Sequence, residues 1–131
     1  MIDHLKRRVA RILASNQTAT LSTSGPAGLQ ARQFPCEADG LSLYLLLPGT
    51  SDHLLNLEKD PNSMISTSAW QLRGRAQVLP LMAAPDSLLL PHLPAAVGCV
   101  LVKIQPAQLQ IYRQNGWGFQ ETIDIDPDLK P

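Results

Sequence analysis

The segment that decides the fold runs from residue 38 to residue 51 and reads ADGLSLYLLLPGTS. Its Asp39-Gly40 pair is typical of a tight turn between two antiparallel strands. The apolar run 41–47 follows, interrupted by a single serine, and its length and composition favour a strand buried on both faces. Pro48-Gly49 then breaks the strand. This segment therefore predicts the end of a hairpin followed by a core strand.

A short helix is expected directly after this strand. Thr50 or Ser51 offers an N-cap hydroxyl for it. The helix would carry Leu54, Leu55 and Leu57 and would end at Asp60-Pro61-Asn62.

The residues before the deciding segment predict one helix and two strands. Apolar residues recur at three- and four-residue steps in the first thirteen positions, which indicates an amphipathic helix. Residues 18–23 alternate as a strand does, and the turn-forming residues 24–28 close it into a hairpin. The second strand of that hairpin is expected from about residue 29 to residue 37.

The residues after the helix predict further short strands. They are expected at 63–70, 72–79, 98–104 and 109–112, with a strand-like stretch at 122–125. Gly74 predicts a β-bulge in the strand at 72–79, because glycine inside a strand often marks one. The Pro- and Leu-rich residues 80–94 predict only one or two short helical turns. Consecutive strands joined by tight turns, with no alternating βαβ order, favour an antiparallel barrel.

Composition limits the function classes. The chain has 131 residues, 44% of them hydrophobic, which suits one domain over residues 1–131. Eleven basic and eleven acidic side chains give a formal net charge of zero, and only six residues are aromatic. A barrel that binds single-stranded nucleic acid needs a basic groove with stacking aromatics, so that alternative is disfavoured and no nucleic-acid partner is expected.

No apolar run is long enough to cross a bilayer, and the first residues do not resemble a secretion signal. We therefore expect a cytoplasmic protein with no membrane partner. Cys36 and Cys99 are expected to be small buried hydrophobes in a reducing compartment and not a disulfide.

The common catalytic motifs are missing from the sequence. It contains no nucleophile elbow, P-loop or dinucleotide fingerprint. His4, His53 and His92 stand far from one another and from both cysteines, so no metal site is expected. Catalytic side chains stay unknown, although a protein without them can be an enzyme when a cofactor carries the reaction.

Four local motifs occur in an order that resembles one known family. They are TATLST (18–23) before a Gly-Pro turn, DGLSLY (39–44), TSDHLLNL (50–57) before Asp60-Pro61, and WQLRGRA (70–76). Together they resemble the pyridoxamine 5′-phosphate oxidase-like, FMN-binding split-barrel family, over roughly residues 5–79. The resemblance implies a mostly β fold with minor α: a six-stranded antiparallel split β-barrel with short flanking helices.

The resemblance also implies a function and a set of site residues. It implies a homodimeric flavoprotein, an oxidoreductase of unknown small-molecule substrate, with FMN bound between the subunits. Arg32 would clamp the flavin phosphate, with Gln33 beside it, and Thr50, Ser51 and His53 would lie at the helix start. The aromatic Tyr112, with Arg113 and Trp117 close by, would reach the flavin of the partner subunit.

Other interpretations stay open at these positions. Arg32 could be a solvent-facing strand arginine, Thr50 or Ser51 a plain N-cap, and the aromatics ordinary packing. The family usually has Arg or Lys where this chain has Asp52 and His53, which predicts weaker phosphate binding. A non-catalytic or degenerate binding module, holding haem, another flavin or no cofactor, is therefore the alternative. Arg73 and Arg75 share one strand face, which solvation, dimer contacts or a ligand would explain equally well.

Overall fold

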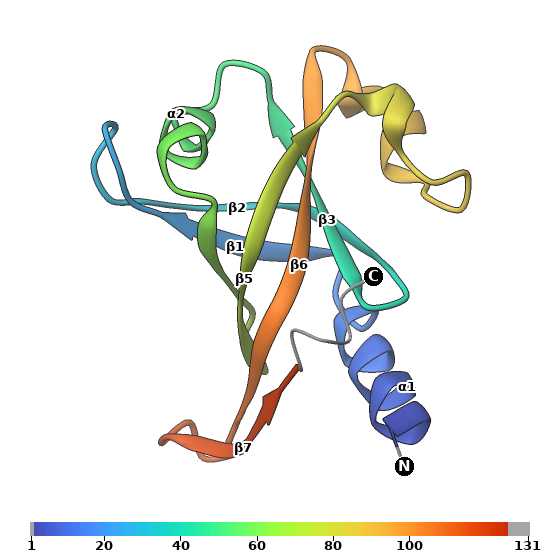
Figure 1. Ribbon diagram of the computed structural model, residues 1–131, viewed down its shortest axis with the longest axis vertical. Coiled ribbons are helices and arrows are strands. Elements are labelled where there is room, and N and C mark those ends of the chain that lie inside the picture. The colour runs from blue at the N-terminus through green and yellow to red at the C-terminus, as the bar shows by residue number, and fades with distance from the viewer. Residues whose placement is uncertain (1, 126–131) are drawn as a thin grey trace.

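The computed structural model of the protein describes residues 2–125 (Figure 1). Its two α-helices and seven strands are α1 (Ile2–Leu13), β1 (Thr18–Thr23), β2 (Gln30–Asp39), β3 (Ser42–Pro48), α2 (Asp52–Lys59), β4 (Asn62–Ser66), β5 (Trp70–Leu79), β6 (Cys99–Tyr112) and β7 (Phe119–Asp124). Three 3₁₀ turns lie between β5 and β6, namely η1 (Leu81–Ala83), η2 (Leu90–His92) and η3 (Pro94–Ala96).

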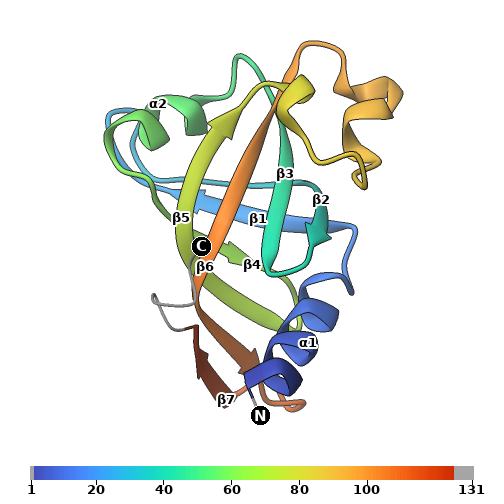
Figure 2. The same ribbon diagram turned by 45° about the vertical axis from the view of Figure 1, so that its right-hand side comes forward.

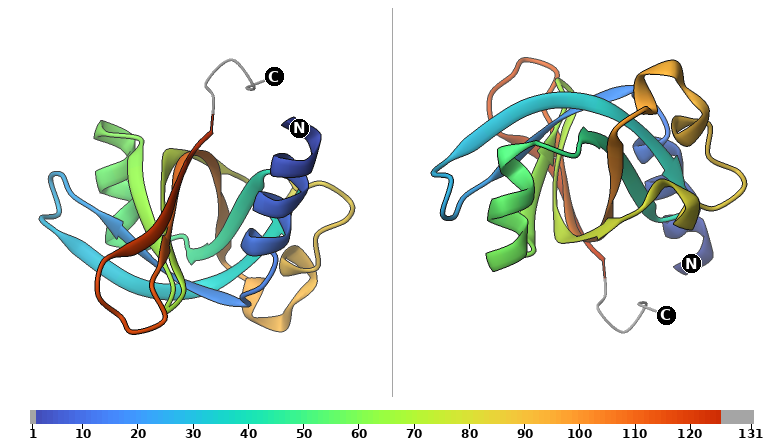
Figure 3. Two further views of the ribbon diagram at one scale, coloured as in Figure 1. Left: turned by 90° about the horizontal axis from the view of Figure 1, so that it is seen from below. Right: turned by 90° about the horizontal axis from the view of Figure 1, so that it is seen from above.

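The strands form one antiparallel sheet that closes on itself. Their order is β3-β2-β1-β4-β5-β6-β7, and an additional pairing between β3 and β6 closes the first six into a barrel. The predicted six-stranded barrel is therefore confirmed, and β7 extends the sheet beyond it by pairing with the end of β6. Figures 1 and 2 place α2 and α1 at opposite ends of the barrel. The two views of Figure 3 show the β1–β2 hairpin projecting beside α2.

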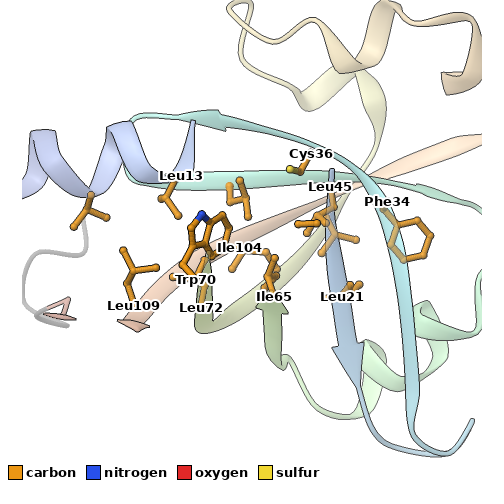
Figure 4. Packing of buried hydrophobic residues seen from close by; sticks show 14 of the residues in the cluster. Leu13, Leu21, Phe34, Cys36, Leu45, Ile65, Trp70, Leu72, Ile104 and Leu109 are labelled. Carbon is orange, nitrogen blue, oxygen red and sulfur yellow. The ribbon is translucent and has the colours of Figure 1, made fainter. Parts of the chain in front are cut away.

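The core follows from the alternation of inward and outward side chains along each strand. Trp70 is 1% exposed and lies between Leu13 of α1 and Leu72 of β5 (Figure 4). Its indole N–H donates to Asn16 Oδ1 at 3.2 Å, which satisfies the polar atom of this large ring. The prediction that Trp70 is a packing residue is confirmed.

Strand β3 is buried on both faces, as its apolar run predicts. Leu43, Leu45 and Leu47 belong to the barrel core. Tyr44 and Leu46 point the other way, into a second cluster formed with the connection between β5 and β6. The 3₁₀ turns of this connection therefore cover the outer face of β3.

Two of the predicted strand boundaries are wrong. The strand expected over residues 63–70 ends at Ser66, because Thr67 Oγ1 accepts hydrogen bonds from the backbone N–H groups of Ala69 and Trp70. These bonds fix a tight turn, and β5 begins at Trp70 rather than at Leu72.

The strands predicted at 98–104 and 109–112 are a single strand, β6, which continues through Pro106. A β-bulge lies here: Arg73 pairs with Gln108 and Gly74 with Pro106, so Ala107 is the extra residue. Because a bulge leaves ladder positions unpaired, it tolerates a residue that has no N–H. The bulge expected at Gly74 is confirmed.

Helix α1 is linked to the end of the sheet by an ion pair. The Arg8 guanidinium binds the Glu121 carboxylate of β7 through two bonds, one of them 2.6 Å from Nη1 to Oε2. Both side chains are more than one-third exposed, so solvent screens the pair and it contributes little to stability.

Candidate functional site

The amino-terminal end of α2 is the first element of the candidate site. Ser51 is its N-cap residue, and Ser51 Oγ accepts a hydrogen bond from the His53 backbone N–H at 3.3 Å. This resolves the choice between Thr50 and Ser51 as the N-cap. Asp52 occupies the first turn and is exposed. The free backbone N–H groups of this turn give the helix end a partial positive charge.

His53 is buried, with only 2% of its surface exposed. Its Nδ1 lies 2.7 Å from Thr23 Oγ1 of β1, and its ring meets Phe34 edge-on at 5.4 Å between centroids. Asn56 Nδ2 donates to the same Thr23 oxygen at 3.1 Å. His53 Nε2 is buried and has no hydrogen-bond partner among residues 2–125.

Asn56 fastens α2 to the β1–β2 hairpin. Its Nδ2 also donates to the Gly28 carbonyl at 2.9 Å, and its Oδ1 accepts from the Ala27 N–H at 2.9 Å. A side chain at Gly25 would bring a Cβ to 2.9 Å from the same Oδ1, so the hairpin approaches the helix too closely for any other residue there. The helix start and the hairpin are therefore held as one unit.

Arg32 reaches the same end of the barrel from β2. It is paired with Leu21 and shares a strand face with Phe34, the residue that contacts His53. Burial lowers the pKa of His53, and the nearby positive charge of Arg32 lowers it further, while Asp52 acts in the opposite direction. The structure thus brings Arg32, Ser51 and His53 together. Thr50 is the exposed residue just before Ser51.

Gln33 lies apart from these residues. Because neighbouring residues of a strand point to opposite faces, Gln33 lies on the face of β2 opposite to that of Arg32 and Phe34; both Arg32 and Gln33 are exposed. Its amide donates to Thr18 Oγ1 at 3.1 Å.

Tyr112, Arg113 and Trp117 lie at the other end of β6. Cys99 pairs with Pro48 near the start of α2, and Tyr112 is reached after the remaining length of the strand, on the order of 40 Å. Tyr112 stacks on Phe119 at 5.2 Å, Arg113 Nε donates to the Phe119 carbonyl, and Trp117 is 80% exposed. A single chain therefore does not bring these three residues to Arg32 and Ser51.

Sequence reasoning missed Thr23 and Asn56, the two residues that complete the cluster around His53. A signal for each was present. Thr23 occupies an inward position in the alternation of β1, and Asn56 follows His53 by three residues, which places both on one helix face. A polar residue on an apolar face indicates a buried hydrogen-bond partner.

The buried imidazole makes stability depend on pH. The pKa of His53 lies below 6.5 in the folded chain, so on acidification the unfolded chain takes up a proton that the folded chain does not. Stability therefore falls as the pH drops below 6.5. We expect the urea midpoint of the wild type to fall more steeply between about pH 7.5 and about pH 5.5 than that of His53→Gln. His92→Gln, at an exposed position, is the matched control, and equal slopes for all three proteins would contradict the burial of a neutral ring.

The remaining titratable groups offer less chemistry. Among residues 2–125, no three His, Cys, Asp or Glu side chains gather as a metal site would require. Cys36 and Cys99 are free; Cys36 is buried as expected, whereas Cys99 is only half-buried. Burial raises the pKa of the Cys36 thiol to about 11, so it is a poor nucleophile. No helix within the described residues is long and apolar enough to cross a membrane.

Comparison with known proteins identifies the fold. No family model matches the sequence, and no curated protein does. Among solved structures, the general stress protein 26 of Bacillus anthracis str. Sterne has a TM-score of 0.64 at 19% identity, over 93% of this chain and 99% of that chain. A putative pyridoxamine 5′-phosphate oxidase from Listeria innocua has a TM-score of 0.60 at 19% identity, over 82% and 97%.

A FAD-binding protein from Mesorhizobium loti is also similar, with a TM-score of 0.60 at 13% identity, over 79% of this chain and 90% of that chain. The protein therefore has the split-barrel fold of the pyridoxamine 5′-phosphate oxidase-like proteins, as its motifs predicted.

Proposed function

We propose that this protein is a flavoprotein that binds FMN, with the flavin phosphate held between Arg32 and the amino-terminal end of α2. The observation that carries the proposal is the convergence of Arg32, Ser51 and His53 at one end of the barrel. The similar structures include a putative pyridoxamine 5′-phosphate oxidase and a FAD-binding protein, which supports a flavin as the cofactor.

The residues present fit a phosphate. The Arg32 guanidinium can donate two parallel hydrogen bonds to phosphate oxygens. The Ser51 hydroxyl already accepts from the His53 N–H, so its own hydrogen is free to donate, and the helix end favours an anion. His53 Nε2 is a further polar atom at the same end, and it has no hydrogen-bond partner among residues 2–125. Asp52 is the one group in this set that repels an anion.

Bound FMN would supply two-electron redox chemistry toward a small organic substrate. The chain would position the cofactor and exclude water from it. We further propose a cytoplasmic homodimer, in which Tyr112, Arg113 and Trp117 of one subunit approach the flavin bound by the other. Their position at the far end of β6 and the exposure of Trp117 support a role across an interface.

The absorption spectrum of protein purified without added cofactor tests this proposal. We expect a yellow protein that releases FMN on denaturation, or a colourless one that takes up added FMN and quenches its fluorescence. Light scattering should give twice the mass of one chain. Protein that neither carries nor takes up FMN would refute the cofactor assignment.

Replacement of Asp52 by a basic residue is expected to strengthen FMN binding. Asp52→Lys replaces an exposed negative charge beside the phosphate with a positive one, and each such exposed charge is worth about 0.2–1 kcal/mol. We therefore expect FMN to bind about five- to tenfold more tightly, as measured by fluorescence titration. Because a carboxylate stabilises the start of a helix, a slightly lower melting temperature should accompany the gain. Glu58→Lys, in the last turn of α2, is the matched control and should leave the affinity unchanged.

A second candidate is a non-catalytic binding module on the same barrel. The exposed Asp52 and the lowered pKa of His53 favour it, because both reduce the positive charge available to a phosphate. This candidate predicts no stoichiometric FMN uptake. Titration of the same protein with hemin, followed by its absorption band, would distinguish a haem-binding module from a barrel with no cofactor.

A further inference from the structure

A groove of about 590 Å³ lies on the outer face of the barrel, at the base of the β1–β2 hairpin. Its lining includes Ser22, Leu29, Asn62, Met64, Arg73 and Arg75. Pockets that hold small organic ligands have volumes of about 300–1,000 Å³, so this groove is of suitable size.

Two guanidinium groups line this groove, and neither forms an ion pair with a carboxylate among residues 2–125. Arg73 and Arg75 lie on the outward face of β5, about 6.6 Å apart along the strand, and Gly74 between them faces inward. No carboxylate among residues 2–125 lies within 4 Å of either group, since the ion pair Arg8–Glu121 is the one formed in that range. Two positive charges on the same strand face repel each other, and an anion bound between them would offset the repulsion.

The cross-strand neighbours of both arginines are neutral. Arg73 is paired with Met64 on β4 and with Gln108 on β6. Arg75 is paired with Asn62 and Gln105 on the same two strands. An opposite charge across the strands would stabilise each arginine, and neither has one, so both guanidinium groups are available to a bound anion.

One carboxylate, that of Asp60, lines the groove at its edge. Its Oδ1 already accepts a hydrogen bond from the Asn62 backbone N–H at 3.0 Å, which closes the turn after α2. Asp60 therefore has a local structural role, and the two arginines retain a net positive charge in the groove.

The other groups of the groove indicate the body of the ligand. Ser22 and Ser24 add hydroxyl groups that can bind oxygen atoms. Leu29 is 82% exposed and Met64 is half-buried, so an apolar surface lies beside the charged groups. The combination fits a molecule with an anionic group at one end and an apolar body.

We propose that this outer groove binds a small organic anion, a phosphate monoester or a carboxylate with an apolar body, through Arg73 and Arg75. The site is distinct from the one at the start of α2. Arg32 is paired with Leu21, whereas Ser22, the next residue of β1, points to the opposite face of the sheet and lines the groove. Thr23 lies between the two: it lines the groove, while its hydroxyl binds His53.

The test uses the full chain and 1-naphthyl phosphate as the probe, with benzoate and inorganic phosphate as partial probes. In a two-dimensional ¹⁵N NMR titration we expect shifts confined to backbone amides around Ser22, Asn62, Met64 and Arg75. The affinity should fall about tenfold in Arg73→Gln and in Arg75→Gln, and further in the double variant. Arg7→Gln removes an exposed arginine of α1 outside the groove and should bind the probe as the wild type does. Raising the salt concentration should weaken binding.

Three results would overturn the proposal. The first is no binding of 1-naphthyl phosphate at millimolar concentration. The second is binding that persists in the Arg73→Gln/Arg75→Gln variant. The third is displacement of the probe by FMN with loss of both ligands in Arg32→Gln, which would place the probe in the α2 site. Because the probe titration needs no flavin, a protein that fails to bind FMN leaves this test intact.

Discussion

Arg32→Gln is expected to lower the affinity for FMN at least tenfold. Glutamine keeps much of the length of the side chain but removes the charge and the guanidinium fork. A hydrogen bond to a charged group contributes about 1.5–3 kcal/mol, and about 1.4 kcal/mol corresponds to a factor of ten. The neighbouring groups cannot compensate, since His53 is held neutral by its lowered pKa and Asp52 carries the opposite charge.

Quenching of FMN fluorescence measures this effect, and Arg7→Gln, an exposed arginine on α1, is the control. The same variant gives a readout that needs no cofactor. The positive charge of Arg32 lowers the pKa of His53, so its removal should raise that pKa in an NMR titration of the ring. An unchanged FMN affinity would remove Arg32 from the site, and an unchanged His53 pKa would show that the two side chains are farther apart than the structure places them.

Gly74→Val is expected to have the largest effect on folding. A Cβ at this position would lie 2.5 Å from the Gln105 carbonyl oxygen and 2.8 Å from Ile104 Cγ2. Both groups belong to β6, the partner strand, so relief of the clash requires β5 and β6 to separate near the bulge. Overpacking of this kind costs about 1–3 kcal/mol or more, and the methyl groups of valine add to it. We expect a loss of at least 3 kcal/mol, a large share of the typical 5–15 kcal/mol.

Urea denaturation followed by circular dichroism measures this loss. Ala107→Val places the same side chain at the exposed bulge residue on the opposite strand, and it should change the stability by less than about 0.5 kcal/mol. A Gly74→Val protein with the stability of the wild type would mean that β6 can move away from β5 at the bulge without loss of stability.

Most of the barrel could be predicted from local patterns because each strand carries its own alternation and each turn its own residues. Thr18–Thr23 and the run 41–47 are strands for this reason, and Ser51 begins a helix because its hydroxyl can bind the next turn. The predictions failed where a distant partner decides the outcome. Pro106 remains within β6 because a bulge accommodates it, and that bulge exists only once β5 is paired alongside.

The candidate site shows the same division. Ser51 could be identified from its place before an apolar helix, and Arg32 from its resemblance to a family position. The burial of His53 could not, because Thr23 lies thirty positions earlier in the chain and meets the ring only in the folded barrel. Asn56 likewise binds groups of the hairpin at Ala27 and Gly28, which no periodicity of α2 reveals.

Trp70 is buried and Trp117 is exposed, so the fluorescence of the two tryptophans reports on different parts of the protein. Trp70 is enclosed in the core and should emit at short wavelength, out of reach of iodide, until the barrel opens. Trp117 is solvated in the turn between β6 and β7, so its emission should be red-shifted and quenched by iodide. A second subunit that covers this turn would shield Trp117 alone, so dilution of the protein would restore its quenching while the Trp70 signal stays constant.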